Sequence, residues 1–335
     1  MQKNYKLKYK TMRLTKLIAV VFSTVLIAGS AMSQPKIDLR PNETVLLYTD
    51  SFEGNTDLVY GEIKYAGYKM EEDNELTGPE RLYDNGNLSN TSSLVRFDLY
   101  FPKKPNGQMV IVCPGGGYEI TSTYNEGLYV AEWMLKKGIT VAVVKYRMPN
   151  QHSKVPATDV WNTFRYCRKN ATKWNVSQIG VMGFSAGGHL AATVSTMWPD
   201  TETRPDFSIL IYPVITMEVG VTHKGTREKL IGKKAIWDKQ KGEKYSLDNQ
   251  ITRFTPPTFI AHCTDDTVVP IENALRYYKK LVDNEVDAEM HIWPRGGHGW
   301  GFTRQEYRDS GKDPFGYGRK DFESLLALWL DSLAK

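Results

Sequence analysis

A glycine-flanked serine between two apolar segments constrains this chain most: Gly183-Phe184-Ser185-Ala186-Gly187. The run before it, Ile179–Met182, is typical of a buried strand, and the residues after it, 188–194, read as the first turns of a helix. A serine on so sharp a strand-to-helix turn exposes its hydroxyl, and the glycines let the two backbones pass closely. The N–H of Ala186 would point from the helix N-terminus at a carbonyl under attack. The pentapeptide alone also fits a connection without chemistry, so its meaning depends on partners elsewhere in the chain.

Strand-like and helix-like segments alternate from Leu94 to the C-terminus. The further predicted strands are 94–101, 109–113, 140–145, 207–212, 258–262 and 288–293. The further predicted helices are 126–137, 157–169, 271–282 and 322–333. Alternating βαβ units predict an α/β fold with a mostly parallel central sheet and helices on both faces. In such sheets, functional residues gather at the carboxyl ends of the strands.

The N-terminal 33 residues have the pattern of a secretory signal peptide. Six basic residues and no acidic ones precede or enter an apolar run, 17–28, and Ala31-Met32-Ser33 resembles a cleavage site. The run is short for a membrane span, although an uncleaved anchor is the alternative. We therefore expect a secreted or periplasmic protein without stable membrane insertion. Without this segment the net charge of +5 becomes −1, so no broad basic surface for nucleic acid is expected.

The remaining chain divides into two predicted parts. Residues 34–92 are polar and rich in turn formers, which predicts an extended N-terminal arm, or edge strands, packed on the main domain. Residues 93–335 form the predicted main domain. Within it, residues 217–255 interrupt the strand–helix rhythm with many lysines, which fits either a lid or a solvated pair of surface helices. Three cysteines, Cys113, Cys167 and Cys263, are too few and too odd in number for a disulfide framework, and we expect buried free thiols.

Three glycines follow the strand that ends at Cys113, in the stretch Pro114-Gly115-Gly116-Gly117-Tyr118. Bare backbone N–H groups at Gly116 and Gly117 could converge with that of Ala186 on one oxygen atom, as an oxyanion hole requires. A phosphate-binding loop is disfavoured because the Walker spacing and its lysine are missing. A plain glycine turn is the other alternative.

Acidic residues and a histidine follow the last two predicted strands. Asp265 and Asp266 come after the strand 258–262, and His298 lies between Gly297 and Gly299 after the last strand. We expect Asp265 to orient His298, because it is nearer the strand, and Asp266 to meet solvent or cap the next helix. Serine triads are known in three chain orders. The order Ser185, Asp265, His298 matches the one in which the acid lies between the nucleophile and the base.

These motifs carry a resemblance to a known superfamily. The sequence resembles α/β-hydrolases of the esterase and lipase type and, more narrowly, secreted bacterial carbohydrate acetylesterases of the acetylxylan-esterase-like kind. The resemblance covers about residues 94–335 and includes the stretches Pro114–Tyr118, Asn125-Glu126-Gly127, Lys145–Pro149, Gly183–Leu190, Thr255–Phe259, Asp265–Pro270 and Gly296–Gly299. It implies the α/β-hydrolase fold, a serine esterase mechanism and a small acyl group, acetyl first, on a sugar hydroxyl such as that of xylan. Pro114 stands where related lipase loops carry a histidine, which leaves the backbone donors intact.

The expected reaction needs neither a metal nor another cofactor. Ser185 attacks the ester, His298 moves the proton and Asp265 holds the imidazole. The candidate substrate-binding residues are Tyr118, at the end of the glycine loop, and Trp300, which could pack on a sugar ring; packing in the core is the more common role of a tryptophan. The expected partner is an acylated carbohydrate or another small ester. Two alternatives are a peptidase similar to prolyl oligopeptidases and a non-catalytic binding protein with the same fold.

Overall fold

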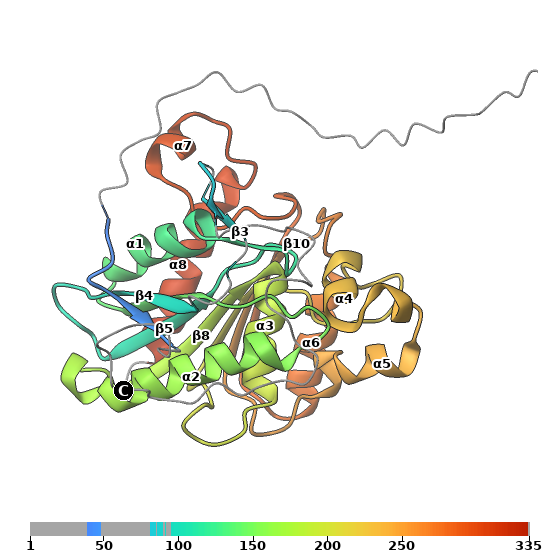
Figure 1. Cartoon of the computed structure of the whole chain (residues 1–335). Helices are drawn as coiled ribbons and strands as arrows, with labels where there is room; N and C mark the ends of the chain where they lie inside the picture. Colours follow the sequence, from blue (N-terminus) through green and yellow to red (C-terminus); the bar gives the residue numbers. More distant parts are fainter. Residues whose placement is uncertain (1–38, 48–80, 85, 90, 92–94, 334–335) are drawn as a thin grey trace, which may run out of the picture. The chain divides into compact units, whose positions relative to one another are not determined.

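A computed structural model describes residues 39–47, 81–84, 86–89, 91 and 95–333, of which 95–333 form the bulk (Figure 1). Residues 39–335 cluster as one compact unit. The predicted signal peptide and most of the predicted arm lie outside the described residues. The described parts of the arm include the strands β1 (Glu43–Leu46), β2 (Arg81–Leu82) and β3 (Asn87–Ser89).

The centre of the unit is an eight-stranded sheet with the order β1-β4-β7-β5-β8-β9-β10-β11. Six neighbouring strands, from β7 to β11 in this order, run parallel, and β4 and β1 add antiparallel strands at one edge. This arrangement confirms the predicted α/β fold with a mostly parallel sheet. The bounds are β4 Arg96–Tyr100, β5 Gln108–Cys113, β7 Thr140–Lys145, β8 Gln178–Phe184, β9 Ser208–Ile211, β10 Thr258–Cys263 and β11 Ala288–Trp293. A small second sheet joins β2, β3 and β6 (Ile120–Ser122).

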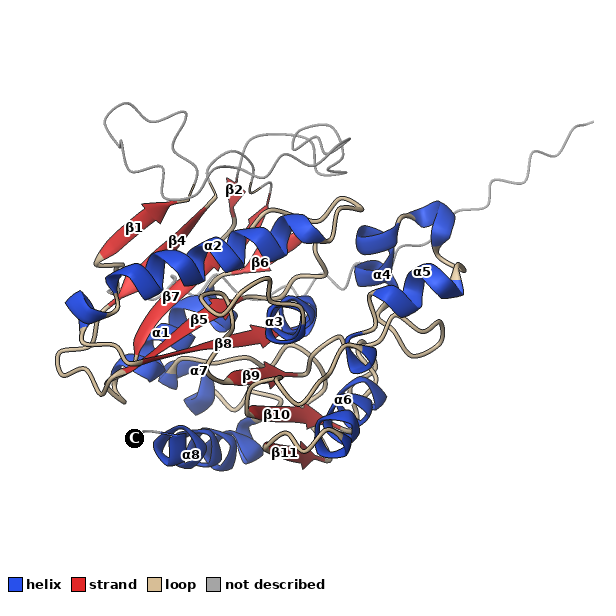
Figure 2. Cartoon of the chain, turned by 90° about the horizontal axis from the view of Figure 1, so that it is seen from below, coloured by secondary structure: helices blue, strands red, loops and turns tan. Residues whose placement is uncertain are grey.

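Helices cover both faces of the large sheet (Figure 2). On one face lie α2 (Lys154–Asn170), α3 (Ser185–Thr196) and α6 (Glu272–Asp283). The other face is covered by α1 (Tyr129–Leu135) and α8 (Gly316–Leu333), and the aromatic rings of Phe207 and Phe259 pack there against Trp329 of α8. The short elements are a π-helical turn at Tyr124–Leu128, a 3-10 turn at Thr172–Trp174 and α7 (Gln305–Asp309).

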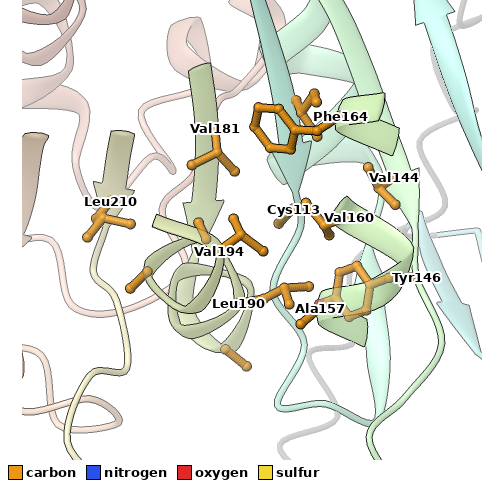
Figure 3. Close-up of a cluster of buried hydrophobic side chains, with 14 of the residues drawn as sticks. Cys113, Val144, Tyr146, Ala157, Val160, Phe164, Val181, Leu190, Val194 and Leu210 are labelled. Atoms are coloured by element: carbon orange, nitrogen blue, oxygen red, sulfur yellow. The ribbon is translucent and has the colours of Figure 1, made fainter. Parts of the chain in front are cut away.

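The apolar core between α2, α3 and the sheet explains why the central strands are apolar throughout (Figure 3). Every residue of β5 is buried, as parallel strands covered on both faces require. From α2, Ala157, Val160 and Phe164 meet Leu190 and Val194 of α3 in this core. These contacts fix the position of helix α3 on the sheet, and with it the position of Ser185, the first residue of the helix. Cys113, Cys167 and Cys263 are buried free thiols, as expected.

The insertion at residues 217–255 folds as a helical segment between β9 and β10. It contains α4 (Lys224–Ile231), α5 (Lys239–Lys244) and 3-10 turns at Lys233–Ala235 and Leu247–Asn249. Arg227, a buried residue of α4, ties the segment together by donating to the carbonyls of Met217, Ile236 and Asp238. Whether the segment acts as a lid remains a prediction, but its backbone is anchored by its own buried guanidinium.

Candidate active site

Ser185 lies at the junction of β8 and α3 with a backbone φ of +52°, in the left-handed region. For a residue with a side chain this conformation is strained, and such strain is concentrated at functional sites. The flanking glycines are needed for space. A Cβ atom on Gly183 would lie 2.2 Å from the carbonyl oxygen of Gly187, and one on Gly187 would lie 2.2 Å from that of Cys113. The local sequence thus builds the sharp turn that the pattern predicts.

His298 reaches Ser185 from the loop after β11. Its Nε2 atom lies 2.8 Å from the Oγ atom of Ser185. The loop owes its shape to glycines on both sides, because Gly297 and Gly299 have φ values of +62° and +73°. The structure therefore brings together the serine and the histidine that the sequence analysis singled out, 113 positions apart in the chain.

The acidic partner of His298 is Asp266, so the prediction of Asp265 is wrong. Asp266 Oδ2 lies 2.6 Å from His298 Nδ1, and its other oxygen accepts the N–H groups of Val268 and Val269, both at 2.9 Å. Asp265 instead accepts the N–H groups of Gly296, at 3.2 Å, and Gly297, at 2.8 Å. The cause is the turn after β10, in which the N–H of Asp266 donates to the carbonyl of Cys263. This turn brings the second acid back toward the site and leaves the first to hold the histidine loop.

Asp266 is held as an anion by its neighbours. The residue is only 6% exposed, and burial by itself acts to raise its pKa. Hydrogen bonds from His262 and His298 outweigh this effect and hold the pKa of Asp266 well below its usual value. His262, buried in β10, lies with Nε2 3.2 Å from Asp266 Oδ2 and 3.0 Å from the carbonyl oxygen of Val269. The sequence analysis placed His262 in the strand but did not find this contact, because it depends on the turn.

The glycine loop after β5 lies against the serine. A Cβ atom on Gly115 would be 3.0 Å from Ser185 Cβ and 2.6 Å from the carbonyl oxygen of Phe184. The next two residues have φ values that favour glycine, +131° at Gly116 and +67° at Gly117. Within the part of the chain that the structure describes, neither of their N–H groups donates a hydrogen bond to the protein. The N–H of Ala186 lies in the first turn of α3, where helical N–H groups have no partner within the helix.

A buried carboxylate that the sequence analysis did not assign lies behind the glycine loop. Glu126 accepts the N–H of Gly115 at 2.7 Å and the hydroxyl of Tyr212 at 2.8 Å. The Tyr212 ring in turn lies 4.8 Å from the His298 ring, measured between centroids. The only sequence signal for Glu126 was its presence in one of the stretches that carry the family resemblance.

His223 is a second missed residue, brought to the site by the insertion. It is half-buried at the N-terminus of α4, and its Nδ1 atom accepts the N–H of Thr226 at 3.3 Å. Its ring faces the glycine loop, since a Cβ atom on Gly117 would lie 3.7 Å from His223 Cε1. Burial lowers the pKa of His223, and the nearby charge of His298 lowers it further. His223 is therefore neutral near pH 7 and carries its proton on Nε2.

The two predicted substrate-binding residues are buried. Trp300 is 3% exposed and stacks on Phe315 with 4.2 Å between ring centroids, so the prediction that it packs on a sugar ring is wrong. Tyr118 is 1% exposed, and its hydroxyl lies 3.1 Å from His189 Nδ1. It borders a cavity of about 600 Å³ between α2, α3 and the insertion, but its burial does not fit the expected contact with substrate at Ser185. Apolar packing explains both positions better than ligand binding does.

Two further observations concern the described residues only. No cluster of His, Cys, Asp or Glu side chains among them could hold a metal ion. None of the described helices has the length and apolar character needed to cross a membrane.

Fold and site together define an α/β-hydrolase of the esterase type. A sequence profile of the BD-FAE family matches residues 97–281, more than half of the chain. The chain therefore belongs to the BD-FAE family.

Two curated relatives have names that refer to xylan or its acetyl esters. Over 215 residues the chain is 40% identical to an acetylxylan esterase of Xylanibacter ruminicola, covering 63% of this chain and 45% of that protein. Over 214 residues it is 31% identical to endo-1,4-beta-xylanase B of Butyrivibrio fibrisolvens, covering 59% of this chain and 33% of that protein. The chain thus spans less than half the length of these two curated relatives.

A solved structure also matches. The acetyl ester-xyloside bifunctional hydrolase of Caldicellulosiruptor lactoaceticus aligns with a TM-score of 0.60 at 32% identity, covering 72% of this chain and 88% of that one. A carboxylesterase of Lactobacillus plantarum aligns with the same TM-score at 21% identity, which is a likeness of fold.

Proposed function

We propose that this protein is a serine esterase that removes small acyl groups, acetyl first, from carbohydrate. The observation that carries the proposal is the hydrogen-bonded chain from Ser185 Oγ through His298, 2.8 Å away, to Asp266 Oδ2, which lies 2.6 Å from the other ring nitrogen. Nucleophile, base and acid in such a chain are the parts that acyl transfer requires.

The proton moves between Ser185 and His298. Ser185 Oγ attacks the ester carbonyl while His298 Nε2 accepts the hydroxyl proton and then returns it to the leaving alcohol. Asp266 accepts the Nδ1–H of His298, so that Nε2 is free to accept, and it stabilises the imidazolium that forms. A water molecule, activated by the same imidazole, then releases the acid from Ser185.

The developing oxyanion is held by backbone donors. The N–H groups of Ala186 and of Gly116 or Gly117 are the candidates. Ala186 follows Ser185 directly, the two glycines follow Gly115, which lies against Ser185, and the N–H groups of the two glycines are not used inside the described protein. The loss of one such donor costs about 2.7–4 kcal/mol of transition-state stabilisation in comparable enzymes. No step of this mechanism needs a metal or an organic cofactor.

The substrate class is inferred from the relatives. An acetylxylan esterase and a xylanase are among the similar proteins, and an acetyl ester-xyloside hydrolase has a similar structure. Because Tyr118 and Trp300 are buried, we assign the contact with the sugar to His223, whose Nε2–H can donate to a hydroxyl or ring oxygen beside Gly117. The predicted leader at residues 1–33 favours a secreted or periplasmic enzyme acting on polymers outside the cytoplasm.

Acetate release from acetylated xylan tests the function. Purified protein lacking residues 1–33 is incubated with the polymer and, in parallel, with a small synthetic acetyl ester, and the Ser185→Ala variant is the control. Release by the wild type alone is the expected result for both substrates. Hydrolysis of the small ester but not of xylan would retain the esterase and reject xylan. No reaction with either substrate, or equal reaction by the variant, would refute the proposal.

A further inference from the structure

Glu126 is a buried carboxylate without an ion-pair partner among the described residues, and the proposed chemistry does not use it. It is 4% exposed, and its two oxygens accept hydrogen bonds from neutral donors only, the Gly115 N–H and the Tyr212 hydroxyl. Burial of an ionised carboxyl group is costly unless its lone pairs are well satisfied. A side chain of this kind next to a candidate active site is therefore a sign of function rather than of packing.

The backbone around Glu126 is itself unusual. It lies in the π-helical turn Tyr124–Leu128, where the N–H of Leu128 donates to the carbonyl of Thr123 at 2.7 Å. Single π-helical turns occur frequently at functional sites, because the wider turn redirects a side chain. Here the redirected side chain is the one that reaches the glycine loop.

One oxygen of Glu126 fixes the loop that carries the proposed oxyanion donors. Oε2 lies 2.7 Å from the N atom of Gly115, directly before Gly116 and Gly117. Gly115 has no room for a side chain, since a Cβ atom there would meet Glu126 Oε2 at 2.8 Å and Ser185 Cβ at 3.0 Å. The carboxylate thus fixes the position of the Gly115–Gly117 loop relative to Ser185.

The other oxygen fixes the side of the site that holds the histidine. The Tyr212 hydroxyl donates to Oε1 at 2.8 Å and accepts the N–H of Gly301, from the loop that follows His298, at 2.9 Å. The Tyr212 ring packs on His298, and the backbone of Tyr212 has a φ of +38°. A bulky residue is strained in this region, so the surrounding contacts must hold it there.

We propose that Glu126 is a positioning residue whose ionised carboxylate aligns the Gly115–Gly117 loop and the His298 loop with Ser185 and favours the imidazolium of His298. The inference rests on the proposed esterase function. Glu126 touches neither substrate nor reacting atoms; it acts through Gly115 and Tyr212.

The ionised form is the one that fits the contacts. Both oxygens accept a hydrogen bond, so protonation of Glu126 would break one of them or reverse the bond with Tyr212. Burial raises the pKa of Glu126, while the bonds from Tyr212 and Gly115 and the charge of His298 oppose the rise. The other titratable group facing it is Tyr146, and Arg319 of α8, which acts on Tyr212, is paired with Asp313.

The test compares Glu126→Gln, Tyr212→Phe and Glu126→Asp with a matched control, Glu132→Gln. Glu132 lies in the following helix, half-exposed, and forms a surface ion pair with Lys136. The readouts are kcat and KM for a small acetyl ester across pH, and the rate at which a fluorophosphonate labels Ser185. Thermal unfolding shows that each variant is folded.

Glu126→Gln is expected to lower kcat by about 10- to 100-fold with KM within twofold, because loop and serine lose their alignment. Loss of the negative charge destabilises the imidazolium, so the acid limb of the kcat/KM profile moves to lower pH by about half a unit or more. Tyr212→Phe and Glu126→Asp keep the charge, so they should lower kcat yet leave the acid limb in place. If Glu126→Gln does not fold, the loss of kcat in these two variants still tests the alignment of the loops, and kcat values equal to that of Glu132→Gln would refute it.

Two results would overturn the inference in different ways. Glu126→Gln with the kcat and pH profile of Glu132→Gln, beside an active wild type, refutes the positioning role and leaves the esterase function intact. A wild type that neither hydrolyses the ester nor reacts with the fluorophosphonate refutes the proposed function and this inference with it.

Discussion

Asp266 and His298 lie 2.6 Å apart, Oδ2 to Nδ1, although their positions in the sequence differ by 32. The adjacent Asp265 binds the backbone of the loop that carries His298. Two neighbouring acidic residues thus have different roles. One orients the imidazole, and the other shapes the loop on which the imidazole sits.

These different contacts predict different effects when either aspartate is replaced by asparagine. Asp266→Asn should lower kcat for a small acetyl ester by about 10⁴-fold, because it favours the wrong tautomer of His298. Asp265→Asn keeps an acceptor for one loop N–H and should cost about tenfold or less. Steady-state kinetics of both variants decide the matter, and a larger loss in Asp265→Asn would contradict the assignment.

The strained backbone of Ser185 predicts a stability difference between two inactive variants. At a φ of +52°, glycine avoids the steric cost that alanine retains. We expect Ser185→Gly to exceed Ser185→Ala by about 1 kcal/mol in the free energy of unfolding. Urea denaturation measures this difference, and equal midpoints would argue against strain at the serine.

The lowered pKa of His189 predicts how the stability of the protein depends on pH. Burial lowers its pKa to about 4, against an ordinary value of 6.5, and the hydrogen bond to the Tyr245 carbonyl opposes this only in part. The unfolded chain therefore takes up a proton below about pH 6.5 that the folded protein does not, so stability falls as the pH drops from 6.5 toward 4.

Between pH 7 and pH 5 this single group should remove about 2 kcal/mol of stability. The measurement is urea denaturation at both pH values for the wild type and for His189→Gln, which cannot titrate. The variant should lose less stability than the wild type over this interval. The same loss in both proteins would show that His189 is not the group responsible.

Replacement of His223 should change substrate binding without changing the rate of the chemical step. His223→Asn preserves the cap of α4, because asparagine can accept the Thr226 N–H, but it removes the imidazole beside Gly117. We expect KM for an acetylated xylo-oligosaccharide to rise about 5- to 10-fold, the value of one lost hydrogen bond, with kcat within about twofold. A small synthetic ester without a sugar serves as control, and an equal rise in its KM would contradict a contact with the carbohydrate.

Local patterns explain what was predictable here. Apolar runs such as Met109–Cys113 make buried parallel strands, and the glycines around Ser185 leave the room that a sharp turn needs, because both effects act between residues close in the chain. The candidate nucleophile and base, Ser185 and His298, followed from their positions after strands. The separation of these two residues along the chain did not hide them, since strand ends of a parallel sheet meet at one edge.

The sequence by itself determined the α/β architecture, the serine turn and the histidine loop. Only the tertiary structure decided that Asp266 rather than Asp265 reaches His298, that Trp300 lies in an aromatic core, and that Glu126 and His223 belong to the site. The physical reason is that the spacing of apolar residues indicates whether a segment forms a strand or a helix. The direction of one side chain, in contrast, depends on a single turn and on partners far away in sequence. Adjacent aspartates with the same chemistry are told apart by geometry alone.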